Sequence, residues 1–175
     1  MSIKTIFLDR DGVINHEVGY LHRVEDFLFI DGVFESCLYF QSLGYNIIVI
    51  TNQSGISRGY YDVNQFQQVN DFMLEQFKAH GINILDVFFC PHGPEDACVC
   101  RKPNPGMFNS AKQKYDINMA CSWMIGDKEA DVKAANNAGI NHTILVRSGH
   151  DIDETESNAE YILESIKDAH TIIRN

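Results

Sequence analysis

Apolar and polar positions along the chain follow two different periods. Short apolar runs of strand length occur at 3–8, 45–50, 84–89, 122–125 and 143–146. Between these runs, apolar residues recur at the spacing of a helix that buries one face. This second pattern predicts helices around 34–43, 62–80, 105–115 and 131–137, three of them ended by the glycines at 44, 81 and 139. The segment 159–173 should hold a last short strand or helix.

Strands that alternate with helices favour parallel βαβ units. We therefore expect an α/β fold of three layers, with a Rossmann-like parallel sheet and helices on both faces. The length suits a single domain over residues 1–175, and no insertion has room for a separate cap domain. The acidic stretch 149–157 is interpreted as a solvated loop without a site.

Composition narrows the class of protein. The chain has 24 acidic and 14 basic residues and a net charge of −10, so it lacks the basic patch of a nucleic-acid binder. No apolar run approaches the roughly 18 residues that cross a bilayer, and we expect no secretory leader before the first strand. We expect a cytoplasmic protein, monomeric, with no nucleic-acid or membrane partner. The five cysteines are an odd number, which does not suit a secreted disulfide scaffold.

A pair of carboxylates ends the first apolar run. Asp9 and Asp11 are two positions apart, so on a strand they would project to the same side, with Arg10 facing away. Two like charges held close together need a cation or a shared proton. At this point the pair is consistent with a metal site, a proton-sharing pair or a surface turn.

The other strand ends carry polar groups as well. Ligands of parallel sheets bind at the carboxyl ends of the strands. Asp9, Asp11 and Asp127 offer hard oxygen ligands suited to Mg²⁺. Thr51 and Lys102 offer a hydroxyl and a point charge suited to phosphate oxygens, and we expect Lys102 to face phosphate without supporting the core. A metal, a lysine, a hydroxyl and a carboxylate pair are typical of phosphoryl transfer.

Three cysteines and a histidine form a second cluster. Cys90, His92, Cys98 and Cys100 lie within one short segment, and three thiolates with one imidazole suit closed tetrahedral Zn²⁺. We expect this zinc to be structural, because a site with three thiolates has no open position and does not attract phosphate. Cys37 and Cys121 are interpreted as residues packed in or near the core.

The set Asp9-x-Asp11, Thr51, Lys102 and Gly126-Asp127-x-x-x-Asp131 resembles the four motifs of the haloacid dehalogenase (HAD) superfamily, in the same order and over most of the chain. The resemblance implies that Asp9 is the nucleophile and Asp11 the general acid/base. It also implies that Thr51 and Lys102 stabilise the phosphoryl group. Mg²⁺ would be held by Asp9, Asp127 and the backbone carbonyl of Asp11, with Asp131 supporting these ligands.

Longer motifs narrow the resemblance. Asp-Arg-Asp-Gly at 9–12, Thr-Asn-Gln-Ser-Gly-Ile-x-Arg-Gly at 51–59, the cysteine loop and Cys-Arg-Lys-Pro-x-Pro-Gly-Met at 100–107 resemble the heptose-1,7-bisphosphate 7-phosphatases. This implies hydrolysis of a phosphorylated sugar, in lipopolysaccharide or nucleotide-heptose biosynthesis. The loop between His92 and the second cysteine pair is shorter than in many relatives, which puts the shape of the substrate rim in doubt. By position, the expected substrate contacts are Glu17, Val18, Gly19, Tyr20, Asn52, Gln53, Ser54, Arg101 and Lys128.

Two other functions remain open on the sequence. Histidinol-phosphate phosphatases are near relatives with the same chemistry and a different leaving group. A receiver-type signalling domain also combines a parallel sheet with clustered Asp, Thr and Lys around Mg²⁺, but it keeps the phosphate as a switch. The carboxylate pair and the cysteine loop argue against that alternative. A zinc-dependent nucleic-acid module is disfavoured by the charge.

Overall fold

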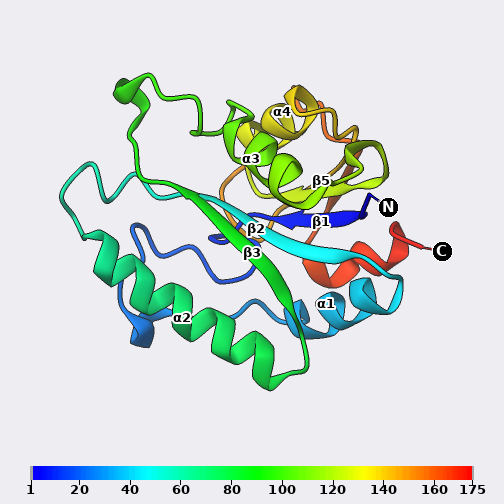
Figure 1. Cartoon of the computed structure of the whole chain (residues 1–175), viewed down its shortest axis with the longest axis horizontal. Coiled ribbons are helices and arrows are strands. Elements are labelled where there is room, and N and C mark those ends of the chain that lie inside the picture. Colours follow the sequence, from blue (N-terminus) through cyan, green and yellow to red (C-terminus); the bar gives the residue numbers. More distant parts are fainter. Residues whose placement is uncertain (1, 175) are drawn as a thin grey trace.

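The structure is a computed structural model that describes residues 2–174. It contains one six-stranded parallel sheet in the order β3-β2-β1-β4-β5-β6 (Figure 1). The strands are β1 (Thr5–Leu8), β2 (Asn46–Asn52), β3 (Ile84–Cys90), β4 (Trp123–Gly126), β5 (His142–Val146) and β6 (Tyr161–Leu163). The expected parallel α/β fold is confirmed, and β1 lies in the middle of the sheet because the chain crosses over it between β3 and β4.

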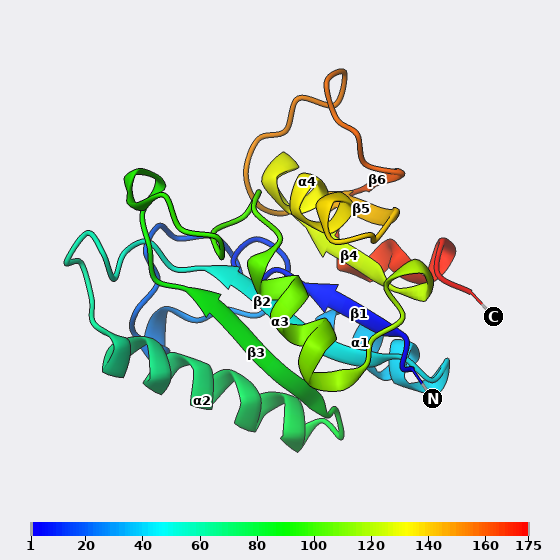
Figure 2. The ribbon, with the colours of Figure 1, turned by 45° about the horizontal axis from the view of Figure 1, so that its top comes forward.

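Helices cover both faces of the sheet, as expected (Figure 2). One face packs against α1 (Val33–Ser42) and α2 (Val63–Ala79), and the other against α3 (Gly106–Tyr115) and α4 (Glu129–Asn137). The alternation of side chains along β1 divides the core accordingly. Ile6 and Leu8 belong to the cluster with α1 and α2, while Phe7 belongs to the cluster with α3 and α4.

The local sequence explains where the helices begin. Asp62 caps α2, since its side chain accepts a hydrogen bond from the backbone N–H of Gln65, whose own side chain bonds back to the Asp62 backbone. Helix α4 begins two residues before the predicted position because Asp131 accepts hydrogen bonds from the backbone N–H groups of Asp127 and Lys128. The same carboxylate therefore ends β4 and begins α4.

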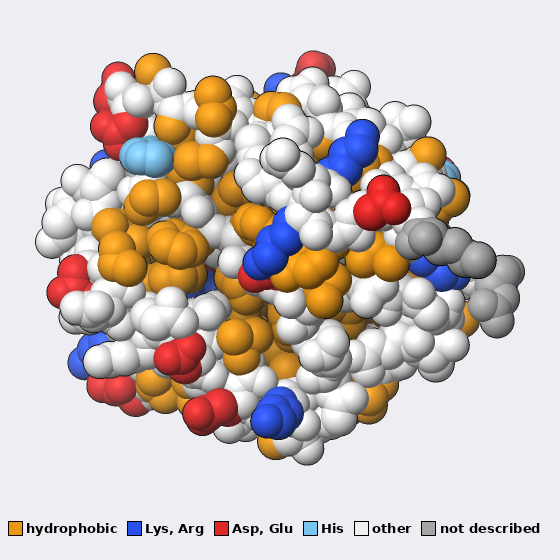
Figure 3. Space-filling model, viewed as in Figure 1, with side chains coloured by type: hydrophobic (Ala, Val, Ile, Leu, Met, Phe, Trp, Pro, Cys, Tyr) orange, Lys and Arg blue, Asp and Glu red, His pale blue; other side chains and the backbone are white. Residues whose placement is uncertain are grey.

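The final segment contains both of the elements left open by the sequence. Strand β6 is followed by a 3-10 helix over Ile166–Thr171, which packs against α1. Three further short 3-10 turns, over Val24–Asp26, Pro94–Asp96 and Met119–Cys121, were not predicted. The space-filling view shows hydrophobic side chains gathered across the middle of the face on which the edge strand β3 lies (Figure 3). Among residues 2–174, no helix combines the length and the apolar character needed to cross a membrane.

Candidate active site

The carboxyl end of β1 places Asp9 in a buried position beside a lysine. Asp9 follows the last strand residue directly and is 8% exposed. Its Oδ1 accepts a hydrogen bond from the backbone N–H of Arg10 at 2.9 Å and lies 3.0 Å from the Nζ of Lys102. Burial, followed by the negative charge of Asp131, raises the pKa of Asp9 well above its usual value despite Lys102. Such a carboxylate is poised to gain a positive partner.

Lys102 joins three elements of the site. Its Nζ lies 2.6 Å from Oδ1 of Asp131 and donates a hydrogen bond to the carbonyl of Ile50 at 2.8 Å, in addition to the contact with Asp9. Burial alone would lower its pKa, but Asp131 and Asp9 raise the pKa of Lys102 above its usual value. The expectation that Lys102 supports no core is wrong, because the side chain is 3% exposed and balances two buried carboxylates.

Asp127 follows β4 and has one oxygen free. Its Oδ2 lies 3.0 Å from the backbone N of His150, which donates a hydrogen bond, and 2.6 Å from the ring Nδ1 of the same residue. Its Oδ1 is buried and has no hydrogen-bond partner within residues 2–174. Burial, and then the charge of Asp131, raise the pKa of Asp127 to about 6. An unpartnered buried carboxylate oxygen is costly unless it binds a cation.

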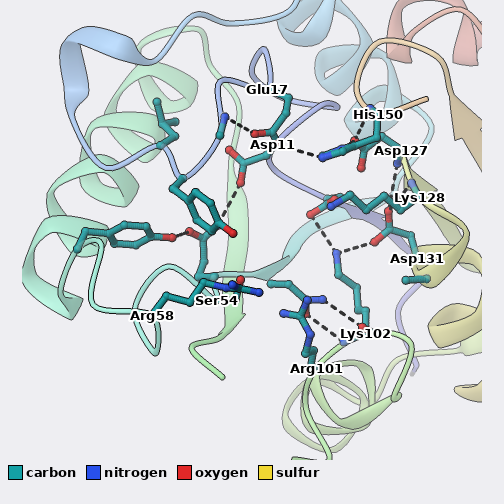
Figure 4. A pocket seen from close by; sticks show the side chains of 18 residues that line it. Asp11, Glu17, Ser54, Arg58, Arg101, Lys102, Asp127, Lys128, Asp131 and His150 are labelled. Carbon is teal, nitrogen blue, oxygen red and sulfur yellow. Dashed lines mark hydrogen bonds and ion pairs between the residues drawn. The ribbon is translucent and has the colours of Figure 1, made fainter. Parts of the chain in front are cut away.

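The carboxylates fit a divalent cation. One oxygen from each of Asp9, Asp127 and Asp131 lies within 4.8 Å of the others. When all three are ionised, they leave two negative charges after Lys102 is counted, which is the charge that Mg²⁺ would neutralise. Since Asp131 is occupied by Lys102 and two backbone N–H groups, Asp9 and Asp127 are the side chains free to bind the ion. Figure 4 shows Lys102 directed at Asp131, with His150 beside Asp127.

Two glycines make room for Asp127. A Cβ atom at Gly12 or at Gly149 would overlap the Asp127 carboxylate. Gly12 also has φ +86°, a conformation that L side chains rarely adopt. The turn after β1 and the loop after β5 can therefore close over the carboxylate only with glycine at both positions.

Asp11 has different surroundings from Asp9. Its Oδ1 accepts hydrogen bonds from Nη2 of Arg10 at 3.1 Å and from Nδ2 of Asn15 at 3.0 Å, and its Oδ2 accepts one from Nε2 of Gln53 at 3.2 Å. Burial would raise its pKa, but the Arg10 charge and these hydrogen bonds hold the pKa of Asp11 below its usual value. The prediction that Arg10 faces away from the pair is wrong: this arginine is 1% exposed and pairs with Asp11.

The residues at the carboxyl end of β2 differ in what they contact. Thr51 is buried, accepts a hydrogen bond from Gln53 at 2.8 Å and does not itself line the cavity described below. Asn52 forms two hydrogen bonds with the backbone of Lys102, at 3.0 and 3.1 Å, and so fixes the lysine loop to the sheet. Asn52, Gln53 and Ser54 all line the cavity.

A cavity of about 330 Å³ lies over these groups, within the range of small-ligand sites. It is lined by most of the predicted site residues, among them Glu17, Gly19, Tyr20, Arg101, Lys128 and Asp131. Val18 does not line it and is 50% exposed.

Five further lining residues were missed: Leu21, Arg58, Tyr61, Ala130 and His150. Arg58 belongs to the motif at 51–59, which was a usable signal. His150 lies in the loop beyond the carboxyl end of β5, and that strand end was the signal that could have predicted it. The interpretation of 149–157 as a loop without a site is therefore wrong at its first two residues.

Three cations of the cavity have no carboxylate partner in the described part of the chain. Arg58 lies with its guanidinium 6.0 Å from the centre of the Tyr20 ring. Arg101 donates a hydrogen bond to the carbonyl of His92 at 3.2 Å, and Lys128 precedes α4. In a protein of net charge −10, unpaired cations beside a carboxylate cluster suit a ligand with several negative charges.

The cysteine loop gathers the four predicted ligands. The donor atoms of Cys90, His92, Cys98 and Cys100 all lie within 4.8 Å of one another, and Sγ of Cys98 is 3.6 Å from Sγ of Cys90 and of Cys100. Tetrahedral Zn–S bonds of ≈ 2.3 Å place sulfurs about 3.7 Å apart, which these two distances approach, while Sγ of Cys90 and Sγ of Cys100 lie closer, at 2.8 Å. The backbone N–H of Arg101 donates to Sγ of Cys98 at 3.3 Å, so the cluster leads directly into the active-site cations. Cys37 is buried as predicted, whereas Cys121 is exposed, contrary to prediction.

Comparisons with known proteins identify the family of the chain. A family model described as HAD-hydrolase-like matches residues 99–169. A D-glycero-alpha-D-manno-heptose-1,7-bisphosphate 7-phosphatase of Photorhabdus laumondii is 46% identical, covering 90% of each chain. A D-glycero-beta-D-manno-heptose-1,7-bisphosphate 7-phosphatase of Vibrio cholerae is 43% identical, covering 99% of this chain and 98% of the relative. The structure of a D,D-heptose 1,7-bisphosphate phosphatase from B. bronchiseptica, complexed with magnesium and phosphate, superposes with a TM-score of 0.83 at 29% identity, covering 94% of each chain.

Proposed function

The chain belongs to the HAD-like hydrolases and, within them, to the heptose-1,7-bisphosphate 7-phosphatases, and from this premise we propose that it removes the 7-phosphate of D-glycero-D-manno-heptose 1,7-bisphosphate. The observation that carries the proposal is the cavity itself. A carboxylate cluster with two excess negative charges lies at one end, and the unpaired cations Arg58, Arg101 and Lys128 line the same space. A substrate with two phosphates needs both features: the carboxylate cluster to bind a cation for one phosphate, and positive side chains for the other.

In this proposal Mg²⁺ is bound by Asp9, Asp127 and the backbone carbonyl of Asp11. The free Oδ1 of Asp127 and the raised pKa of Asp9 support that assignment. When bound, the ion neutralises the phosphate oxygens and the carboxylates that face them. Lys102 holds Asp9 and Asp131 in place and adds a positive charge next to the nucleophile.

Asp9 and Asp11 have different roles in the proposed reaction. A carboxylate oxygen of Asp9 forms a bond to phosphorus while the bond from phosphorus to the C7 oxygen breaks. The C7 oxygen keeps the bonding electron pair and takes a proton from Asp11, so it leaves as a hydroxyl. Water next attacks the phosphorus of the aspartyl-phosphate and gives a proton to Asp11. The bond between phosphorus and the Asp9 oxygen breaks, so phosphate is released and the Asp9 carboxylate is restored. A phosphate dianion beside Asp11 raises the proton affinity of this carboxyl, which otherwise stays ionised.

The cysteine cluster is proposed to bind a structural Zn²⁺. Its four donors are all used, so the ion would hold the loop at 90–102 rather than bind substrate. The hydrogen bonds from Arg101 to Cys98 and to His92 connect this loop to the cavity. We further propose that the enzyme acts as a monomer in the cytoplasm.

A phosphate-release assay tests the function. The purified protein is supplied with Mg²⁺ and with either anomer of the heptose bisphosphate, and ³¹P NMR follows which phosphate leaves. We expect loss of the 7-phosphate, retention of the 1-phosphate and no turnover in an Asp9→Asn control. The relatives above carry different anomers in their names, so the ratio of kcat/KM between anomers is measured rather than assumed.

Histidinol phosphate is the competing substrate in the same assay. A higher kcat/KM for histidinol phosphate than for both heptose anomers would overturn the proposed substrate. Heptose 7-phosphate provides a sharper comparison, because it lacks only the second phosphate. We expect Arg58→Met to raise KM for the bisphosphate more than for heptose 7-phosphate. Equal effects on the two would contradict the role of this cation.

A further inference from the structure

A closed ring of hydrogen bonds surrounds the carboxylate of Asp11. Nη2 of Arg10 donates to Oδ1 of Asp11 at 3.1 Å and to Oε1 of Gln53 at 3.5 Å. Nε2 of Gln53 donates in turn to Oδ2 of Asp11 at 3.2 Å. Each side chain of the ring contacts the other two, and both oxygens of the carboxylate are held.

The orientation of the Gln53 amide is determined from both ends. Its Nε2 also donates to Oγ1 of Thr51 at 2.8 Å, so it has two acceptors, while its Oε1 accepts from Arg10 and from the hydroxyl of Tyr61 at 2.5 Å. Burial raises the pKa of Tyr61 to about 12, so its hydroxyl keeps the proton that it donates. A flipped amide would place an oxygen against the Asp11 carboxylate and an NH₂ group against the guanidinium, which is unfavourable at both ends.

Two of the three side chains in the ring are buried. Arg10 and Gln53 are 1% and 2% exposed. The guanidinium also lies 5.8 Å from the centre of the Phe66 ring on α2, and Nη1 of Arg10 has no hydrogen-bond partner within residues 2–174. A buried arginine with an unsatisfied nitrogen is expensive to maintain for stability alone. Its other two nitrogens, Nε and Nη2, both donate hydrogen bonds to the Asp11 carboxylate.

We propose that Arg10 and Gln53 are positioning residues that hold the Asp11 carboxylate in the orientation required for proton transfer to the leaving oxygen. The inference rests on the proposed function, since it concerns the residue assigned there as general acid. It changes the expected role of Gln53, which the sequence suggested as a phosphate or sugar contact. It also gives a role to Arg10, the residue between the two catalytic carboxylates.

The proposal predicts a dependence on the leaving group. An alkyl phosphate leaves as a strongly basic oxygen that needs a proton, whereas 4-nitrophenyl phosphate leaves as a weakly basic phenolate that needs little help. Loss of Asp11 positioning therefore lowers kcat/KM for the alkyl ester more than for the aryl ester. A purely structural role would lower both equally. The ratio kcat/KM is used because it reports the steps up to departure of the leaving group.

Two variants separate geometry from charge. Arg10→Lys keeps the positive charge but removes the planar fork, and Gln53→Met removes the amide at similar volume. We expect each to reduce kcat/KM for the heptose bisphosphate about tenfold or more, and for 4-nitrophenyl phosphate about twofold or less. Tyr39→Phe is the control: it deletes one side-chain hydrogen bond remote from the cavity, from the Tyr39 hydroxyl to the carbonyl of Ile173 at 3.0 Å. Its two kcat/KM values should not change.

Equal losses on both esters, or no loss, would overturn the proposal. If the protein hydrolyses another alkyl phosphate and not the heptose bisphosphate, the proposed substrate fails while the leaving-group comparison proceeds with that ester. Crystal structures provide a readout that does not depend on activity. In Arg10→Lys and Gln53→Met the Asp11 carboxylate should shift or occupy more than one position, and in Tyr39→Phe it should stay. An unmoved carboxylate in both ring variants would also overturn the proposal.

Discussion

Two clusters of potential metal ligands lie close together in this molecule and differ in how they are built. The carboxylate cluster of Asp9, Asp127 and Asp131 comes from the ends of two central strands and the start of a helix, and all three residues are buried. The thiol cluster of Cys90, His92, Cys98 and Cys100 comes mostly from a loop and is largely half-exposed. The carboxylate cluster contains its own cation, Lys102, whereas the thiol cluster includes no lysine or arginine.

This difference indicates which cluster needs its metal ion to keep its conformation. Backbone N–H groups, Lys102 and His150 hold the carboxylates at defined positions. The thiols contact mainly one another, and thiols are weak hydrogen-bond donors. We expect removal of Mg²⁺ to stop catalysis and leave the fold intact, and removal of Zn²⁺ to loosen the loop. The following predictions test this contrast from the largest effect to the smallest.

Asp9→Asn should abolish turnover without lowering stability. The substitution removes the proposed nucleophile, so we expect kcat to fall at least about a thousandfold. It also removes one charge from a crowded buried cluster, so the metal-free variant should unfold at the same temperature as the parent or higher. Steady-state kinetics and calorimetry measure the two effects. A marked loss of stability would mean that Asp9 also supports the fold.

Lys102→Met should affect both activity and stability. Two buried carboxylates lose their shared counter-charge, and breaking a buried ion pair costs about 3–5 kcal/mol. Urea unfolding in the absence of metal measures this cost. Because Mg²⁺ supplies positive charge to the same cluster, the difference from the parent should narrow when Mg²⁺ is added. A deficit that is unchanged by Mg²⁺ would place the ion elsewhere.

Zinc removal should loosen the cysteine loop more than it affects the sheet. We expect elemental analysis of the native protein to find zinc. A chelator should lower the free energy of unfolding by about 4 kcal/mol if zinc had been present at a thousandfold over its Kd. Hydrogen exchange should accelerate over residues 90–104 before it accelerates in β1 or β4. Cys98→Ser should reproduce the effect, and Cys121→Ser, which alters an exposed thiol, should not. Native protein without zinc would refute the assignment.

His150→Ala should produce the smallest change, confined to Mg²⁺ binding. The histidine contacts Asp127 through its ring and its backbone, and only the ring contact is lost. Loss of a group that orients a ligand weakens metal binding about tenfold. Calorimetric titration with Mg²⁺ measures this directly, without turnover. His142→Ala, whose ring contacts exposed Glu160 instead, serves as the control.

The sequence was sufficient for the fold and for the groups that end the strands. Periodicity located five of the six strands within one or two residues, because buried parallel strands read as continuous apolar runs, and it left β6 open between strand and helix. The rule that ligands bind at carboxyl strand ends brought Asp9, Gln53 and Asp127 to one cavity, whereas Lys102 was predicted from its charge and from the motif. The resemblance to HAD motifs supplied their roles, which stay proposals until variants are assayed.

What the sequence did not provide is the orientation of side chains in the turns. Strand alternation predicts that Arg10 faces away from Asp11, but the chain has left β1 by then and turns through Gly12. Alternation no longer applies there, so the arginine folds back to pair with its neighbour. His150 lies in the polar loop beyond the carboxyl end of β5, and its contact with a carboxylate twenty-three positions earlier in the chain depends on the tertiary fold.

The order of strands in the sheet also affects how the enzyme folds during its synthesis on the ribosome. Asp9 is on the first strand to be synthesised, but its neighbour β4, which carries Asp127, is made only after β2 and β3. Pairings between segments so distant in sequence form slowly, because a long chain must close first. Until β4 docks, a nascent chain has the proposed nucleophile but lacks Asp127, one of the proposed cation ligands. We therefore expect no hydrolysis until most of the polypeptide has emerged and folded.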